Sequence, residues 1–251
     1  MKKYISRIKL FMNLNLKIYI ITFVALMMSD YSFMYNEKNI SFMSFEFSKA
    51  DVFMLSVNGY YSLALAVFVY LIFINYNRND IERSAMLKFR NFNNIWICKC
   101  VALMVKTLCF TLIFMLSEFI IAINLSDGNN CNFNSTRSIF YYINEGKMPD
   151  RNIKLSYIIC VSSIYIFILF MAIGMINLLM NWLEINKHIS LIVTIFLVII
   201  VQVTGIINTY NLSYDKLLMR TEWIFMYLAI VVILSIFIGS LYCRKKECIN
   251  A

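Results

Sequence analysis

Residues 155–180 read LSYIICVSSIYIFILFMAIGMINLLM, a run of twenty-six positions without a charged side chain. About 20 apolar residues in a helix cross the roughly 30 Å hydrocarbon core of a bilayer, so this run is long enough to span a membrane. Five other apolar stretches resemble it, although the first is interrupted early, after Met28. The six candidate spans are Ile18–Met34, Val52–Ile74, Cys98–Ile123, Leu155–Met180, Ile189–Ile207 and Trp223–Tyr242. The pattern predicts an all-α integral membrane bundle of six transmembrane helices, forming one domain over residues 1–251.

The charges between these spans predict their orientation, because Lys and Arg are retained in cytoplasmic loops during insertion. One set of segments holds fourteen basic and four acidic residues: 1–17, 75–99, 181–188 and 243–251. The other set holds eight basic and nine acidic residues: 29–51, 124–154 and 208–222. Both termini are therefore expected in the cytoplasm. The formal charge of +9 follows from this topology and from attraction to anionic membrane lipid, so we expect no nucleic-acid partner.

Several classes of function are disfavoured by what the chain lacks. The six glycines are too scattered for a phosphate-binding loop, and the single histidine, His188, cannot build the usual metal site. An intramembrane protease needs catalytic groups at membrane depth, whereas His188 lies at a predicted boundary and Lys106 is shallow. We therefore expect no enzyme activity, no metal and no cofactor in this chain. The longest segment between spans, residues 124–154, is too short for an independent soluble domain.

The N-terminal segment before the first span has an amphipathic pattern. On a helix, its apolar residues share one arc and its lysines lie opposite; the apolar set is Tyr4, Ile5, Ile8, Phe11 and Met12. Residues 1–17 are predicted to form an interfacial helix on anionic lipid, with a basic tail that only fixes orientation as the alternative.

The inner segment 75–97 is the longest and most charged predicted cytoplasmic connection. Asn79 followed by Glu82 is a typical helix start, and residues Asp80–Phe89 contain no helix breaker. A short surface helix is therefore expected, with a solvated connector as the alternative. The chain re-enters the membrane beside Trp96 and Lys99, which we interpret as interface anchors.

With these features the chain resembles the ABC type-2 permeases, the membrane subunits of two-part ATP-driven exporters. The resemblance covers the whole chain in architecture and Asn77–Lys106 in sequence, where Arg90 leads into a Trp-x-x-Lys re-entry formed by Trp96 and Lys99. Family members usually carry a re-entrant hairpin between the fifth and sixth spans, but this chain has only Asn208–Glu222 there.

The resemblance implies partners and a location. A separate ATP-binding-cassette ATPase would hold ATP and Mg, and a second six-span permease subunit, the same or a different chain, would complete the pathway. The residues expected to couple to the ATPase are Ile81, Glu82, Arg83, Met86, Lys88, Phe89 and Arg90. Small Gram-positive relatives of this length serve bacteriocin or lantibiotic immunity, other resistance to antimicrobial peptides, or peptide export, which implies the bacterial cell membrane.

Glu118 is the one acid predicted well inside hydrocarbon, in the outer half of the third span. An intramembrane carboxylate is costly and marks a functional site by default, so Glu118 is a candidate for the pathway or the subunit interface. The alternative is a hydrated residue near the outer boundary.

The leading prediction is a permease subunit that exports a peptide or an amphipathic, lipid-like substrate. The alternative is an immunity or sensor protein that binds a peptide at the membrane without moving it. Secondary transport by this chain alone is less favoured, because no internal repeat is evident and no span is expected to be broken by Pro or Gly pairs.

Overall fold

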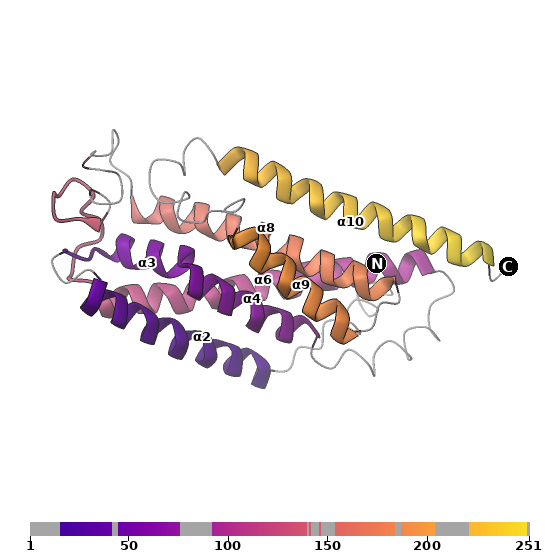
Figure 1. Cartoon of the computed structure of the whole chain (residues 1–251), viewed down its shortest axis with the longest axis horizontal. Coiled ribbons are helices and arrows are strands. Elements are labelled where there is room, and N and C mark those ends of the chain that lie inside the picture. Colours follow the sequence, from indigo (N-terminus) through magenta and orange to yellow (C-terminus); the bar gives the residue numbers. More distant parts are fainter. Residues whose placement is uncertain are drawn as a thin grey trace.

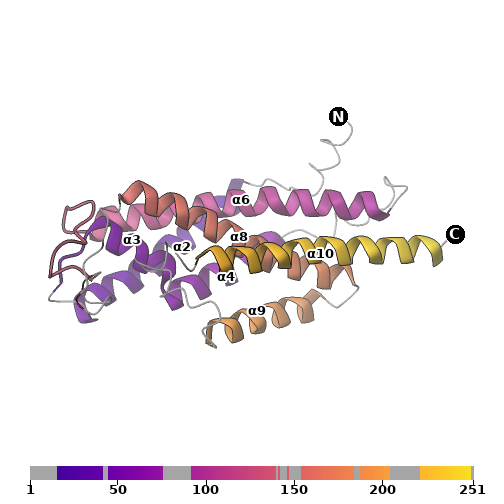
Figure 2. The ribbon, with the colours of Figure 1, turned by 90° about the horizontal axis from the view of Figure 1, so that it is seen from above.

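The structure is a computed structural model that describes residues 16–41, 45–75, 92–139, 141, 146, 154–183, 187–203 and 221–249. Its named elements are all helices: α2 (Leu16–Asn36), the π-helical turn η1 (Glu37–Ser41), α3 (Lys49–Asn58), α4 (Tyr60–Asn75), α6 (Phe92–Leu125), α8 (Leu155–Trp182), α9 (Lys187–Val203) and α10 (Thr221–Ile249). They form an elongated bundle, seen from two sides in Figures 1 and 2. The all-α class is thereby confirmed for the described residues.

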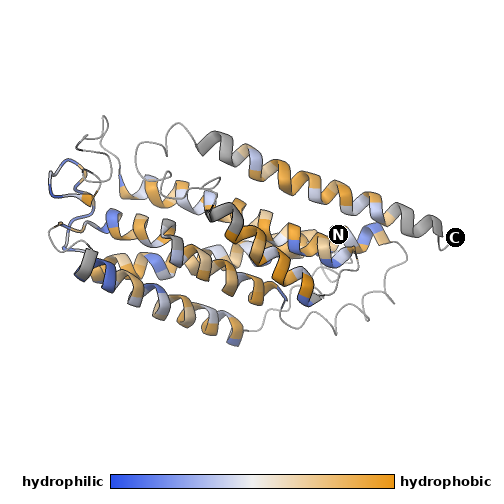
Figure 3. Cartoon of the chain, viewed as in Figure 1, coloured by the Kyte–Doolittle hydropathy of each residue, from blue (hydrophilic) through white to orange (hydrophobic). Residues whose placement is uncertain are grey.

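Four of the helices are long and apolar enough to cross a membrane: Lys17–Asn39, Phe92–Leu125, Leu155–Trp182 and Met226–Cys243. The pair α3 and α4 makes a fifth if it is counted as one bent span, while α9 is shorter. Apolar residues run along the helices, and polar residues gather at the ends of the bundle (Figure 3). Large apolar side chains also remain exposed on the outer faces of the helices. Such surfaces mark contact with lipid or with other chains, and they indicate a multi-pass membrane protein.

The second predicted span, Val52–Ile74, is not a continuous helix. The two helices α3 and α4 meet at a bend of 56°, and Gly59 between them has an extended backbone (φ −60°, ψ 135°). Asn and Gly are weak helix formers, and a Cβ at Gly59 would lie 2.7 Å from the carbonyl oxygen of Leu55. The interruption lies at a single glycine, so it is not of the kind, a Pro or Gly pair, that the sequence analysis considered.

Helix α2 covers the first predicted span, Ile18–Met34, and extends two residues beyond each of its ends. Helix α2 continues through Asp30 to Asn36, so much of the segment predicted as the outer loop 29–51 is helical. The buried face of α2 repeats every four residues: Thr22, Leu26, Asp30 and Met34. Asp30, which the charge count placed in the segment 29–51 although the predicted span Ile18–Met34 contains it, thus belongs to the interior of the bundle.

An aromatic cluster forms the centre of the bundle, with side chains from α4, α6 and α8. The Tyr70 ring lies 5.1 Å from the Phe110 ring and 4.9 Å from the Phe170 ring, between centroids. Its hydroxyl forms a 2.7 Å hydrogen bond with Thr107 Oγ1, which satisfies the polar tip of an otherwise apolar side chain. Gly174 makes room for Tyr70, because a Cβ there would meet the Tyr70 hydroxyl oxygen at 2.3 Å. Helix α8 is thereby packed closely against α4.

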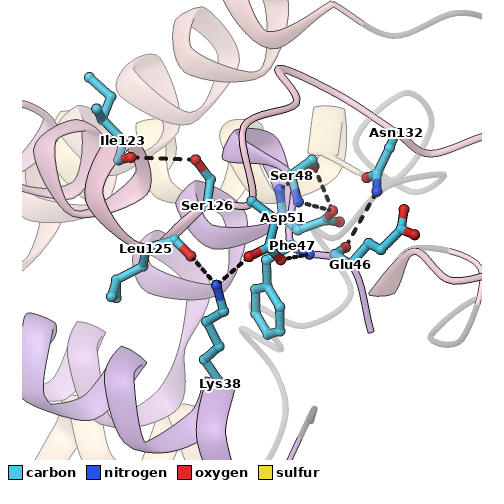
Figure 4. Close-up of polar contacts among 10 residues, drawn as sticks. Lys38, Glu46, Phe47, Ser48, Asp51, Ile123, Leu125, Ser126 and Asn132 are labelled. Atoms are coloured by element: carbon cyan, nitrogen blue, oxygen red, sulfur yellow. Dashed lines mark hydrogen bonds and ion pairs between the residues drawn. The ribbon is translucent and has the colours of Figure 1, made fainter. Parts of the chain in front are cut away.

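At one end of the bundle, the segment before α3 is joined to the segment after α6 (Figure 4). The amides of Lys49 and Ala50 donate to the carbonyls of Asn129 and Asn130 at 2.8 and 3.1 Å. Helix α3 starts with a capping box, in which the Asp51 amide donates to Ser48 Oγ and the Ser48 amide donates to Asp51 Oδ2. Two of the segments predicted to lie outside, 29–51 and 124–154, therefore meet at the same end.

Candidate functional site

The structure brings two carboxyl groups together inside the bundle. Glu118 on α6 and Asp30 on α2 have exposed fractions of 0% and 1%, and their side chains lie within hydrogen-bonding reach of each other. Asp30 is six residues before the end of α2, and Glu118 is seven residues before the end of α6. At about 1.5 Å per residue, both groups lie roughly 10 Å inside the same end of the bundle. Glu118 thus faces another helix of its own chain rather than the outer boundary.

Three serine hydroxyls surround this carboxyl pair. Ser117 Oγ lies 3.3 Å from Glu118 Oε1, and Ser56 on α3 also contacts the Glu118 carboxyl. Ser62 on α4 approaches the Asp30 carboxyl. All three serines are buried, so the site is a polar cluster enclosed by four helices.

The cluster lies beside the break between α3 and α4. Ser56 comes three residues before Gly59 and Ser62 three residues after it, so the two hydroxyls flank the point where the helical hydrogen bonds are interrupted. Irregular backbone at membrane depth occurs where it is enclosed by protein or lines a polar cavity. Buried carboxyls beside a discontinuous helix are typical of ion and substrate sites in transport proteins.

Within the described residues, no basic side chain acts on either carboxyl group; each is influenced mainly by burial, by the other carboxyl and by the serines. The same part of the chain holds no group of three or more His, Cys, Asp or Glu residues that could bind a metal. Among the described residues, the cluster is therefore an acidic site without a basic counter-charge.

Asp30 was missed in the sequence because it follows the apolar run Ile18–Met28 and resembles the polar end of a span. The signal that could have revealed it is helical phase. Asp30 lies four residues after Leu26 and four before Met34, so a continued helix places all three on one buried face.

The two predicted interface anchors are buried among helices. Trp96 has an exposed fraction of 0%, and its Nε1 donates a 3.1 Å hydrogen bond to the carbonyl of Ile236 on α10. Lys99 places its Nζ 4.6 Å from the centroid of the Trp182 ring on α8. Both residues contact protein in the isolated chain, and their depth in a membrane stays a prediction.

A second polar cluster joins α4, α8 and α9 near the opposite end of the bundle. Asn177 accepts a 3.1 Å hydrogen bond from Asn75 Nδ2 and lies 3.3 Å from the hydroxyl oxygens of Ser190 and Thr194, to which its own amide donates. Buried amides of this kind hold membrane helices together at about 0.6 kcal/mol per hydrogen bond. We assign this cluster to helix packing.

Some predicted features lie outside the described residues. These are the N-terminal part of the interfacial helix, residues 1–15, and the segment 204–220 between α9 and α10. The coupling candidates also lie outside them: Ile81, Glu82, Arg83, Met86, Lys88, Phe89 and Arg90.

Comparison with known proteins adds no assignment: no protein-family model, no curated protein and no solved structure matches this chain. The functional argument therefore rests on the helical bundle, its broken span and the buried carboxyl pair.

Proposed function

We propose that this chain is the membrane-spanning permease subunit of an ATP-binding-cassette exporter in the bacterial cell membrane. The permease has six spans, an N-terminal interfacial helix and two cytoplasmic termini. It pairs with a second six-span subunit, and a separate ATPase supplies the energy from ATP and Mg. The substrate class is a peptide or an amphipathic, lipid-like molecule, in a role such as resistance to an antimicrobial peptide.

The observation that carries this proposal is the broken α3–α4 span beside the buried Asp30–Glu118 pair. A bundle that only anchors itself has no need of an interrupted helix next to two costly carboxyl groups. A bundle that changes conformation has a use for both, because the break supplies a hinge and the polar cluster a site that responds to it.

The placement of the inner segment supports the proposed site of coupling. Residues 76–91 connect α4 to α6, and the ends of these helices lie toward the same end of the bundle as the C-terminal end of α10 (Figure 1). This segment and the C-terminal part of α10, which contains Arg244, Lys245 and Lys246, are both rich in Lys and Arg. An ATPase on the cytoplasmic side would meet both of them.

The proposal is tested at Met86. The substitution Met86→Asp places an unpaired carboxylate in the proposed docking contact, which costs about 1–3 kcal/mol or more if the contact is buried. We expect membranes containing tagged wild-type chain to yield vanadate-sensitive ATPase activity on purification, and the Met86→Asp variant to lose most of it at equal membrane insertion. Met86→Leu is the control at the same position and should keep the activity. Equal ATPase yield from all three proteins would remove this segment from the coupling mechanism.

The alternative function is an immunity or sensor protein that binds a peptide without moving it. The observation that favours it is the ordered outer end, where residues 45–50 and 126–139 form a surface that a peptide could contact. The two functions differ in their energy requirement. Protection of cells that persists when the associated ATPase is catalytically inactive would support binding alone.

A further inference from the structure

The contact between Asp30 and Glu118 lacks a hydrogen-bond donor. Asp30 Oδ2 and Glu118 Oε2 are both buried and find no donor among the described residues. Yet the two carboxyl groups are within hydrogen-bonding reach of each other. Ionised carboxylates can only accept, so this contact becomes a hydrogen bond when one of the two groups carries a proton.

The neighbouring serines satisfy only part of the pair: Glu118 Oε1 accepts from Ser117 Oγ at 3.3 Å, whereas Asp30 Oδ2 and Glu118 Oε2 find no donor among the described residues. Ser56 Oγ donates to the Phe53 carbonyl at 3.0 Å, and Ser117 Oγ donates to the Phe114 carbonyl at 2.7 Å. The Ser117 Oγ contact with Glu118 Oε1 is longer, at 3.3 Å. The shorter of the two Ser117 hydrogen bonds is thus the one to the backbone. Among the described residues, Ser62 Oγ finds no partner other than the Asp30 carboxyl beside it, and it is 1% exposed.

The surroundings thus favour a cation, and the described part of the chain supplies none. The groups that reach the pair from α3 and α4 are hydroxyls, Ser56 and Ser62, and no described Lys, Arg or His acts on either carboxyl. Two bare negative charges in this enclosed position would repel each other without solvent to stabilise them. Among the described residues no third His, Cys, Asp or Glu joins the pair to complete a metal site, whereas a proton can be shared by two carboxyl groups alone.

We propose that Asp30 and Glu118 form a proton-binding site, in which one proton carried by Glu118 is shared with the Asp30 carboxylate. The proton joins α2 to α6 beside the hinge at Gly59. Its loss leaves two like charges in contact and weakens the packing of α2 on α6, so occupancy of the site biases the conformation of the broken span. This inference rests on the geometry of the pair and does not depend on the proposed ATPase partner.

The first test is infrared spectroscopy of the full chain in lipid nanodiscs. We expect the wild-type protein to show a protonated-carboxyl stretching band near neutral pH that shifts in D₂O. The double variant Asp30→Asn/Glu118→Gln should lack this band, whereas Glu37→Gln, an acid on the π-helical turn, should keep it. The amides that replace the carboxyls still donate and accept, so the fold is expected to persist. If the double variant fails to assemble, either single variant replaces it. The band seen in the wild-type protein is then expected to vanish or shift in that single variant.

The second test is thermal unfolding as a function of pH. The folded pair binds a proton that the solvated carboxyls of the unfolded chain release near neutral pH, so stability falls as pH rises and the shared proton is lost. The double variant should lose this part of the pH dependence.

Absence of the infrared band in wild type, or its survival in the double variant, would overturn the proposal. Loss of the band when Na⁺ replaces choline at constant pH would overturn it in favour of a sodium site.

Discussion

At the scale of single residues, the Lys38 ammonium group joins two elements at the end of the bundle where α6 terminates. Its Nζ lies 2.7 Å from Asp127 Oδ1 and 2.7 Å from the carbonyl oxygen of Leu125, the last residue of α6. The other carboxylate oxygen, Asp127 Oδ2, accepts a 2.8 Å hydrogen bond from the Phe47 amide. One ion pair thereby ties η1, the end of α6 and the segment before α3 together.

Asp127 makes this connection dependent on pH. Partial burial acts to raise the pKa of Asp127, but the hydrogen bonds from Lys38 and from the Phe47 amide outweigh it and hold the pKa below its usual value. A lowered folded-state pKa contributes stability that is present above the unfolded value and lost as pH falls through the folded one. Because both side chains are partly exposed, we expect this ion pair to contribute about 0.5–1 kcal/mol to the free energy of unfolding at neutral pH.

We therefore expect Asp127→Asn to be slightly less stable than wild type at neutral pH and equally stable in acid, measured by thermal unfolding in lipid. The control is Glu46→Gln, which removes the more open pair with Arg137 at 3.7 Å and should change little. A wild-type acid dependence in the Asp127→Asn protein would disprove the role of this ion pair.

At this scale the sequence predicted half of the buried pair. Glu118 could be identified because a carboxylate in the middle of an apolar run is costly and needs a reason. Asp30 could not be identified by the same argument, because its neighbours after Met28 are polar and resemble a loop. A carboxyl group near the end of a span becomes informative only when the helical phase beyond it is known.

At the scale of helices, α10 contacts the bundle along a narrow line of mostly small residues. Between residues 226 and 243, where its burial is described, the buried positions are Leu228, Ser235, Gly239 and Cys243, and most of the large apolar side chains are exposed. The Trp96 indole on α6 occupies the space left by Gly239, since a Cβ there would lie 2.2 Å from the indole ring. Close approach at a small residue is the usual way in which membrane helices pack.

Gly239→Ala should therefore destabilise the protein by about 1–3 kcal/mol, because the rigid Trp96 ring cannot move aside without losing its hydrogen bond to Ile236. The neighbouring change Ile238→Ala, on the exposed face of α10, should cost no more than about 0.5 kcal/mol. Thermal unfolding of both variants in lipid checks the difference. Equal effects would mean that α10 does not pack on Trp96.

The helices were predicted better than their interruptions. Hydropathy identified the apolar cores of α6 and α8 because it reports which residues avoid water. It did not reveal the bend at Gly59, since the residues on both sides are apolar and a hydropathy window averages over one Asn and one Gly. The start of α3 had a local signal in Ser48 and Asp51, a capping box that precedes an apolar run.

At the scale of the whole molecule, apolar side chains cover the outside of the bundle as well as its core. On α6 the exposed set recurs every four residues: Met104, Leu108, Leu112 and Leu116. The opposite face of α6 carries the fully buried Phe110, Phe114 and Glu118. A helix with one face in the core and an apolar face outside is suited to lipid rather than water.

A tryptophan introduced at Leu112 should accordingly be quenched strongly by lipids with brominated acyl chains, above the constant background of the native tryptophans. Asn129→Trp, in the exposed loop after α6, should be quenched much less. Fluorescence of the two variants in the same liposomes provides the measurement. Weak quenching at position 112 would show that another chain, rather than lipid, covers this face.

Hydropathy also could not predict which helices become neighbours. The contacts of Asn177 with α4 and α9, and of Trp96 with α10, join residues far apart in the sequence. Their specificity lies in matched shapes and hydrogen bonds, which the average polarity of a segment does not record.

The length of α6 has a mechanical consequence. Its 34 residues extend over about 51 Å, well beyond the roughly 30 Å of hydrocarbon that a straight helix must cross. An unbroken helix of this length acts as a stiff rod. A displacement along its axis at Phe92, next to the basic segment 76–91, therefore moves Leu125 by nearly the same distance, and with it the carbonyl that holds Lys38. A displacement at one end of α6 is in this way transmitted to its other end by the helix backbone, without a chain of side-chain contacts.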